Sequence, residues 1–211
     1  MARRLLAAPF LITLLLVLGI ALPVPVAGNP PPAARPVFQY STTATEPVIE
    51  YHVVHHMLVQ QDPIPLLRVY GNGRVQVHFP VYMKRAGDYE MQLSRARLND
   101  LIRQLADDGI LDFDPHAARL ERQQLAAARQ AASGELFHIS DASDTHINVR
   151  LTHYQRNLAS PRINGFVKQF HWRNLDQDAR HYPESSRLSR AAGAATVLRN
   201  LCEHPALRKL P

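Results

Sequence analysis

Apolar and polar residues alternate along the segment that opens the predicted domain. Ile49, Tyr51 and Val53 alternate with Glu50 and His52. An alternation with a period of two is the pattern of a β-strand that buries one of its faces. The segment therefore predicts a strand whose polar face carries Glu50 and His52.

Two further alternating segments flank residues 71–73, which read Gly-Asn-Gly, and predict a β-hairpin. A two-residue turn would place Val69 opposite Gln76 and mix the apolar and polar faces. A three-residue loop pairs Val69 with Val75 and keeps the apolar side chains together. We therefore predict the three-residue loop, with a glycine in the left-handed conformation.

Three segments carry apolar residues at helical spacing. The first follows Ser94, a good N-cap, and ends at Gly109. The second is capped by Asp114, begins with a proline and covers roughly 115–132. The third covers about 184–202. These segments predict two or three helices late in the chain.

Short apolar runs predict further strands at 89–93, 136–139, 146–151 and 162–172. A polar turn separates 136–139 from 146–151, so these two runs predict a second hairpin. The whole pattern predicts an α+β domain. We expect an antiparallel sheet of about six or seven strands built from hairpins, with two or three helices packed on one face.

The first 28 residues predict a secretory signal peptide. Arg3 and Arg4 precede an uncharged apolar run of 18 residues, and small residues at 26–28 suit cleavage before Asn29. Cleavage after Ala34 is the second choice. An uncleaved membrane anchor is the alternative, because the run is at the lower limit of spanning length. In either case we expect an exported protein, periplasmic or secreted.

The chain after the signal peptide divides into two parts. Residues 29–47 hold five prolines and little apolar periodicity, which predicts an extended Pro-rich tether. The segment 48–204 is then expected to form a single α+β domain. Its length suits one domain and is too short for two.

Composition excludes several classes of protein. A lone cysteine, Cys202, cannot form an intramolecular disulfide, a Cys-x-x-Cys redox pair or a cysteine-based zinc site. Removing residues 1–28 takes away two arginines and no acid, so the net charge of the remaining chain falls from +6 to +4. Such a mild charge disfavours a nucleic-acid partner.

Eleven histidines are the residues that suggest chemistry. The predicted second hairpin places His138 and His146 together on its polar face, as direct or diagonal cross-strand neighbours, and in the direct case they are close enough to share zinc or copper. Asp141 and Asp144 in the turn could add oxygen ligands. His52 and His56 share one strand face, but about 13 Å separates them. We therefore take His138 and His146 as the candidate metal ligands.

Several stretches resemble a pattern that recurs in secreted or periplasmic bacterial proteins of unknown function, a Gly-x-Gly hairpin followed by a capped amphipathic helix. The stretches are 67–75, 87–89, Leu93-Ser94 before the helix that ends at Gly109, and Tyr182-Pro183 before the last helix. The resemblance covers roughly 66–201, with Asn72 where the pattern usually has Asp. It implies an α+β fold and an exported location, and it carries over no catalytic residue.

No Gly-x-Ser-x-Gly elbow or His-Glu-x-x-His motif occurs, so an enzyme ranks behind a binding protein. We expect a non-catalytic binding or interaction domain whose partner is an envelope protein or another component of the cell envelope. The membrane itself would be contacted only through an uncleaved N-terminal segment. The alternative is a periplasmic protein that binds a metal through His138 and His146.

Overall fold

The computed structural model describes residues 35–56, 62–137 and 143–211, and within them it has eight strands and four helices. These elements confirm the predicted α+β class. In chain order they are β1 (Val37–Gln39), β2 (Pro47–His55), β3 (Leu67–Tyr70), β4 (Arg74–Phe79), β5 (Gly87–Gln92), α1 (Arg95–Asp107), α2 (Pro115–Ser133), β6 (Ser143–Gln155), β7 (Ile163–Arg173), α3 (Leu175–His181), α4 (Ser186–Cys202) and β8 (Arg208–Lys209).

All strands belong to one antiparallel sheet, in which β6 is flanked by β7 on one edge and by both β2 and β1 on the other. From β2 the sheet continues through β3, β4 and β5 to the short β8. Strand β6 has 13 residues, which is long enough for β2 and β1 to pair with it end to end. It is therefore the central strand of this half of the sheet.

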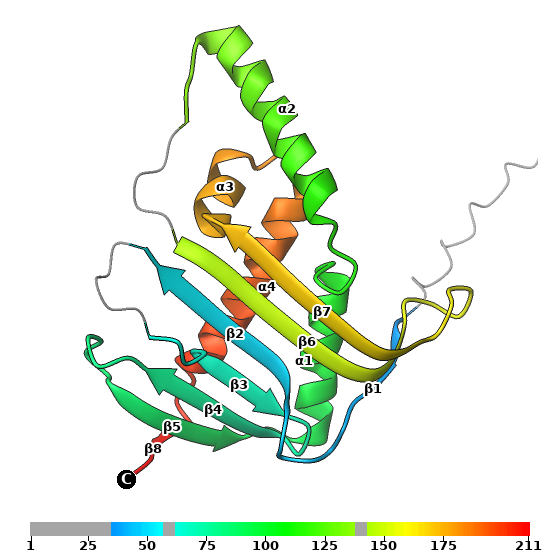
Figure 1. Cartoon of the computed structure of the whole chain (residues 1–211), viewed down its shortest axis with the longest axis vertical. Helices are drawn as coiled ribbons and strands as arrows, with labels where there is room; N and C mark the ends of the chain where they lie inside the picture. Colours follow the sequence, from blue (N-terminus) through cyan, green and yellow to red (C-terminus); the bar gives the residue numbers. More distant parts are fainter. Residues whose placement is uncertain (1–34, 57–61, 138–142) are drawn as a thin grey trace, which may run out of the picture. The chain divides into compact units, whose positions relative to one another are not determined.

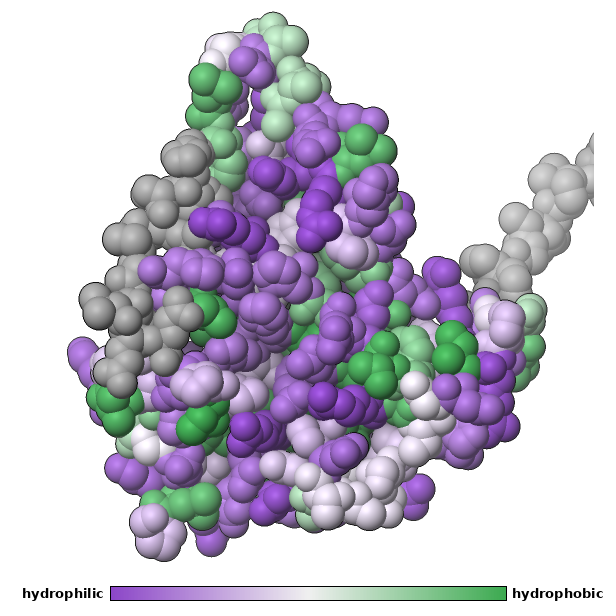
Figure 2. Space-filling model, viewed as in Figure 1, coloured by the Kyte–Doolittle hydropathy of each residue, from purple (hydrophilic) through white to green (hydrophobic). Residues whose placement is uncertain are grey.

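One face of the sheet is covered by helices and the other is open. Figure 1 views the open face, with α1 and α4 behind the strands. Alternate strand residues pack against these helices and form a single core. Its fully buried members include Ile49, Tyr51, Leu67, Val69, Val75, Leu98, Ile102, Leu105, Ile147, Val149, Leu188 and Leu198. The open face is mostly hydrophilic over the strands (Figure 2).

The first predicted hairpin is confirmed in its register. Val69 pairs with Val75 across a three-residue loop, and Gly73 has the left-handed φ of 88°. Gly71 needs its missing side chain for another reason, because a Cβ there would collide with the carbonyl oxygen of Ser41. The chain between β1 and β2 thus lies directly against this turn.

The predicted helix starts are also confirmed. Ser94 Oγ accepts a hydrogen bond from the backbone N–H of Arg97 at the start of α1. Asp114 caps α2 in the same way, with Pro115 as the first helical residue. Each cap satisfies backbone donors that the first helical turn leaves unpaired. Within the described part of the chain, no helix is long and apolar enough to span a membrane.

The predicted boundaries of the domain need correction at both ends. Val37–Gln39, inside the segment predicted as a tether at 29–47, forms β1 and pairs with β6. Arg208–Lys209, beyond the predicted end at 204, forms β8 and pairs with β5. Three- and two-residue strands leave too few alternating positions for a periodicity argument, since their pairing depends on a neighbouring edge.

The predicted second hairpin is wrong. Strand β6 already pairs with β2 on one edge and with β7 on the other, so a strand at 136–139 has no edge to join. Leu136 and Phe137 lie outside any strand, and the Phe137 ring stacks on His181 at 3.7 Å between ring centroids. His138 and the rest of 138–142 lie outside the described residues. Ser143 and Asp144, predicted as part of the turn, belong to β6, and the spacing of the two runs gave no information on which strand is the partner of β6.

Candidate metal centre

Three histidines form a row across the open face of the sheet. His146 on β6 is directly opposite His52 on β2 and directly opposite His171 on β7. Each alternates with buried neighbours, such as Ile147 beside His146, so strand parity sends all three imidazoles to the face without helices. The row is therefore a direct result of the register of three neighbouring strands.

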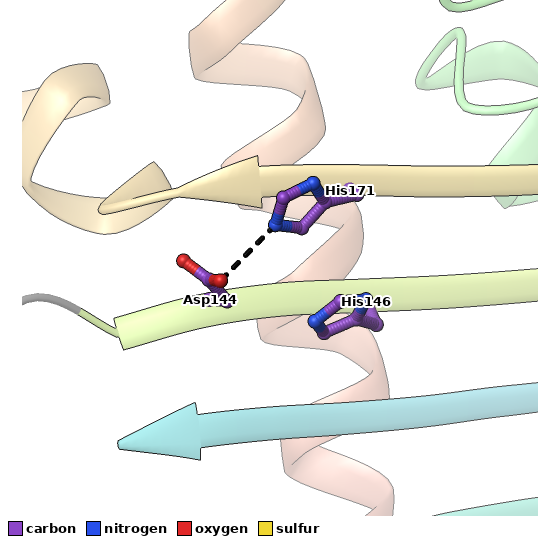
Figure 3. Close-up of side chains that lie close together, drawn as sticks. All are labelled: Asp144, His146 and His171. Atoms are coloured by element: carbon purple, nitrogen blue, oxygen red, sulfur yellow. Dashed lines mark ion pairs between the residues drawn. The ribbon is translucent and has the colours of Figure 1, made fainter. Parts of the chain in front are cut away.

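Asp144 lies two residues before His146 and so projects from the same face of β6. Its Oδ2 is 3.2 Å from Nε2 of His171 and 3.1 Å from Nε2 of His56, just beyond the end of β2. One ligand atom each from Asp144, His146 and His171 lies within 4.8 Å of the other two. Figure 3 shows these three side chains on the adjacent strands β6 and β7.

The rings differ in how closely they approach. His146 and His171 are stacked, with 4.6 Å between ring centroids and 17° between ring planes. His52 is farther away, at 6.4 Å from the His146 ring and tilted by 41°. His146 and His171 therefore form the compact pair, and His52 flanks it.

The electrostatics of the cluster favour the protonation states that a metal needs. Burial, and then the neighbouring His171, lower the pKa of His146. Burial, and then His146, likewise lower the pKa of His52. Burial opposes ionisation of Asp144, but hydrogen bonds from His56 and His171 outweigh it and lower the pKa of this carboxyl. Neutral imidazole and ionised carboxylate are the forms that coordinate metal ions.

Two polar atoms of the cluster are buried and lack a hydrogen-bond partner among residues 35–56, 62–137 and 143–211. They are Oδ1 of Asp144 and Nδ1 of His52. A buried polar atom without a partner costs free energy, so such atoms point to an unfilled bonding role. For Asp144 that role fits a ligand, because Oδ2 of the same carboxylate already accepts from two imidazoles.

The donor set fits a tetrahedral zinc or copper ion. Metal bonds of about 2.0–2.2 Å place neighbouring donors roughly 3.4 Å apart. The separations of up to 4.8 Å therefore need side-chain rotations that bring the donor atoms closer by up to roughly 1.4 Å. Two imidazoles and one carboxylate match zinc centres that keep a coordination position for a further ligand.

His146 was identified from the sequence, but its predicted partner His138 was not tested, because it lies outside the described residues. The structure pairs His146 with His171 instead. A usable signal existed in the predicted strand at 162–172, where His171 stands between Phe170 and Trp172. This alternation already placed His171 on a polar face; what was missing was the pairing of this strand with β6.

His78 on β4, a further histidine on the open face, is chemically different. His78 donates from Nδ1 to Asp88 Oδ1 at 2.7 Å and from Nε2 to Asp62 Oδ2 at 2.9 Å. Burial opposes the charge of His78, but the bonds to Asp88 and Asp62 outweigh it and raise its pKa. An imidazole that donates from both nitrogens has no lone pair for a metal. This group is therefore a structural ion pair.

The acidic stretch near Gly109 is explained by helix ends. Asp114 caps α2, and Asp112 accepts from the Tyr154 hydroxyl at 3.1 Å and lies 3.4 Å from the Arg156 guanidinium. These contacts use the carboxylates within the fold. The centre at Asp144, His146 and His171 is thus the strongest candidate site in the described residues.

Comparison with protein-family models, with curated proteins and with solved structures found no match to this chain. The resemblance to exported proteins with a Gly-x-Gly hairpin and a capped helix stays a prediction.

Proposed function

We propose that this protein is an exported metal-binding protein that holds one zinc or copper ion through Asp144, His146 and His171. The observation that carries the proposal is the approach of their three ligand atoms to within 4.8 Å on two neighbouring strands. The proposal adopts the alternative predicted from the sequence, a periplasmic metal-binding protein, with Asp144 and His171 as the partners of His146. An additional partner in the cell envelope stays a prediction, as does export itself, which rests on residues 1–28.

Two features of the site support metal binding over a chance cluster of polar residues. The ligands stand on strands β6 and β7, which are hydrogen-bonded along almost their whole length. Ligands on paired strands keep their spacing, so little conformational entropy is lost when a metal binds. In addition, His56, just beyond the end of β2, holds the carboxylate of Asp144 through a contact of 3.1 Å between His56 Nε2 and Asp144 Oδ2.

His56 would act as a positioning residue through its bond to Asp144. Outer partners of metal ligands fix the orientation of the ligand, and their loss lowers metal affinity by about 10- to 100-fold. We expect His56→Gln to weaken metal binding within this range and to leave the stoichiometry at one ion. Unchanged affinity would remove His56 from the site without affecting the three ligands.

The decisive experiment is calorimetric titration of the metal-stripped protein with zinc(II) and with copper(II). We expect one ion per chain for the parent and loss of this binding in the double variant His146→Asn, His171→Asn. The control is His116→Asn with His204→Asn, two histidines that lie away from the open sheet face. Circular dichroism confirms that each variant is folded. Equal affinity of the parent and the His146, His171 variant would refute the proposal.

A stability measurement gives an independent readout. A ligand that binds only the folded state stabilises it by about 2.7 kcal/mol when present at a hundred times its dissociation constant. For a chain of this size that corresponds to a rise in Tm of roughly 5–10 °C. We expect the rise for the parent and the His116, His204 control, and no rise for the His146, His171 variant.

A further inference from the structure

We propose that the metal centre also binds a small oxyanion of the carboxylate or phosphate type, held between the metal ion and Arg173. The inference rests on the proposed function, because the anion's first contact is the metal. It adds to that function a second ligand, a small oxyanion, and assigns Arg173 as the residue that binds it.

The three proposed metal ligands lie on the open face of the sheet. Asp144, His146 and His171 all rise from the face of the sheet that none of the four described helices covers (Figures 1 and 3). Their donor atoms therefore approach an ion from the side of the sheet. Zinc with three protein ligands keeps a further coordination position for water or another ligand. With a metal held by these three residues, that position would face away from the sheet and could take a small solute as ligand.

Arg173 lies on β7 close to the proposed metal ligands. Its Cα is paired with that of Asp144, one alternating step along the strand from His171. Buried Trp172 lies between the exposed residues His171 and Arg173, so Arg173 shares the open face with the metal ligands. Directly opposite residues have Cβ atoms about 5 Å apart, well within the reach of an arginine side chain.

No acid among the described residues forms an ion pair with the Arg173 guanidinium. Asp144, the acid opposite Arg173, pairs with His56 and His171 instead. Within residues 35–56, 62–137 and 143–211, no carboxylate lies at ion-pair distance from Arg173. Arg150 on the same face differs, because it donates to Glu50 Oε2 at 2.8 Å. Among the described residues the Arg173 guanidinium thus has no acidic partner, and we take its donors to be those that bind the anion.

Charge and geometry then specify the class of ligand. A divalent ion with one carboxylate and neutral imidazoles leaves a net charge of +1, and Arg173 adds another positive charge beside it. An anion at the open coordination position reduces this charge. The planar guanidinium matches the two oxygens of a carboxylate or phosphate group, with which it forms paired hydrogen bonds. A small oxyanion satisfies both contacts at once.

The test uses cobalt(II) as a spectroscopic substitute for zinc in the purified protein. Cobalt saturation is measured first, and the visible spectrum is then followed during titration with inorganic phosphate and, separately, with acetate. We expect a saturable spectral change with at least one of the two anions. Arg173→Gln should raise the dissociation constant of that anion about tenfold, the equivalent of ~1.4 kcal/mol. The matched control, Arg150→Gln, should bind the anion as the parent does.

The outcomes separate the two proposals. If cobalt, zinc and copper all fail to bind, the proposed function is wrong and the anion site falls with it. If the metal binds but neither anion alters the spectrum, only the anion site is refuted. The role of Arg173 is refuted if Arg173→Gln and Arg150→Gln bind the anion equally well. A change with phosphate alone or acetate alone identifies which oxyanion the centre prefers.

Discussion

A buried hydrogen bond between Asp178 on α3 and Trp172 on β7 gives the sharpest test of the packing beside the metal centre. The indole Nε1–H donates to Asp178 Oδ2 at 2.9 Å, and both residues are only 4% exposed. Trp172 immediately follows His171, one of the proposed metal ligands. The bond therefore fixes the end of β7 that carries this ligand.

Asp178→Ala leaves the indole N–H buried without an acceptor, which costs about 1–3 kcal/mol. Two smaller effects act in opposite directions. Arg122 lies 3.5 Å from the other carboxylate oxygen, but it is partly exposed and contributes little. Burial raises the pKa of Asp178, so its ionised form itself costs some stability. We expect a net loss of about 2 kcal/mol.

The matched variant is Asp178→Asn, which keeps an oxygen acceptor for Trp172 and removes the charge. We expect it to lose less than half as much stability as Asp178→Ala in urea unfolding followed by tryptophan fluorescence. The raised pKa of Asp178 in the folded protein also determines how the free energy of unfolding changes with pH. Protonated Asp178 contributes to the stability of the wild type below pH 3.8, the ordinary pKa of Asp, and this contribution is lost as the pH rises through the folded pKa. The Asn variant should lack this loss. Equal destabilisation by Ala and Asn would show that the hydrogen bond is not what stabilises this corner.

Three further outcomes are expected. Gly71→Ala should lower the free energy of unfolding by about 2 kcal/mol, because its Cβ would collide with the Ser41 carbonyl. Gly193→Ala is the control, since its Cβ would lie in open space on α4, and it should be neutral or stabilising. Similar urea midpoints for the two variants would contradict the contact between Gly71 and Ser41. The pKa of His78 is raised in the folded protein, so protonated His78 contributes its full stabilisation below pH 6.5, and this stabilisation is lost as the pH rises through the folded pKa. His78→Gln should remove this fall in the free energy of unfolding. A pH profile of the variant that matches the wild type would exclude the ion pair. Cys202 is buried with its pKa raised to about 12, so a disulfide reagent should modify it only after denaturant is added, and rapid reaction of the folded protein would contradict its burial.

Elements whose signals are local were predictable from the sequence. The hairpin at 71–73 and the caps Ser94 and Asp114 each depend on side chains within a few residues of one another. The structure confirms all of them, together with the strand predicted at 162–172. In these places propensity, pattern and tertiary packing agree.

Strand partners were not predictable, because they depend on contacts between distant parts of the chain. The run 136–139 had the composition of a strand, yet β2 and β7 occupy the two edges of β6. The error carried directly into the site, since it paired His146 with His138 in place of His171. His56 reaches Asp144 from the end of β2, and spacing within its own strand gave no sign of that contact. Face assignments from parity were reliable, and assignments of neighbours were not.

The position of β6 in the sheet has a consequence for how the chain folds. Glu50 on β2 and Arg150 on β6 are joined by an ion pair although 100 residues separate them. The hairpins from β3 to β5 can form from nearby residues, but closing a loop of this length costs much more chain entropy. We therefore expect the pairing of β2, β6 and β7 to complete folding late. Since Asp144, His146 and His171 meet only in that step, metal uptake would report the finished fold.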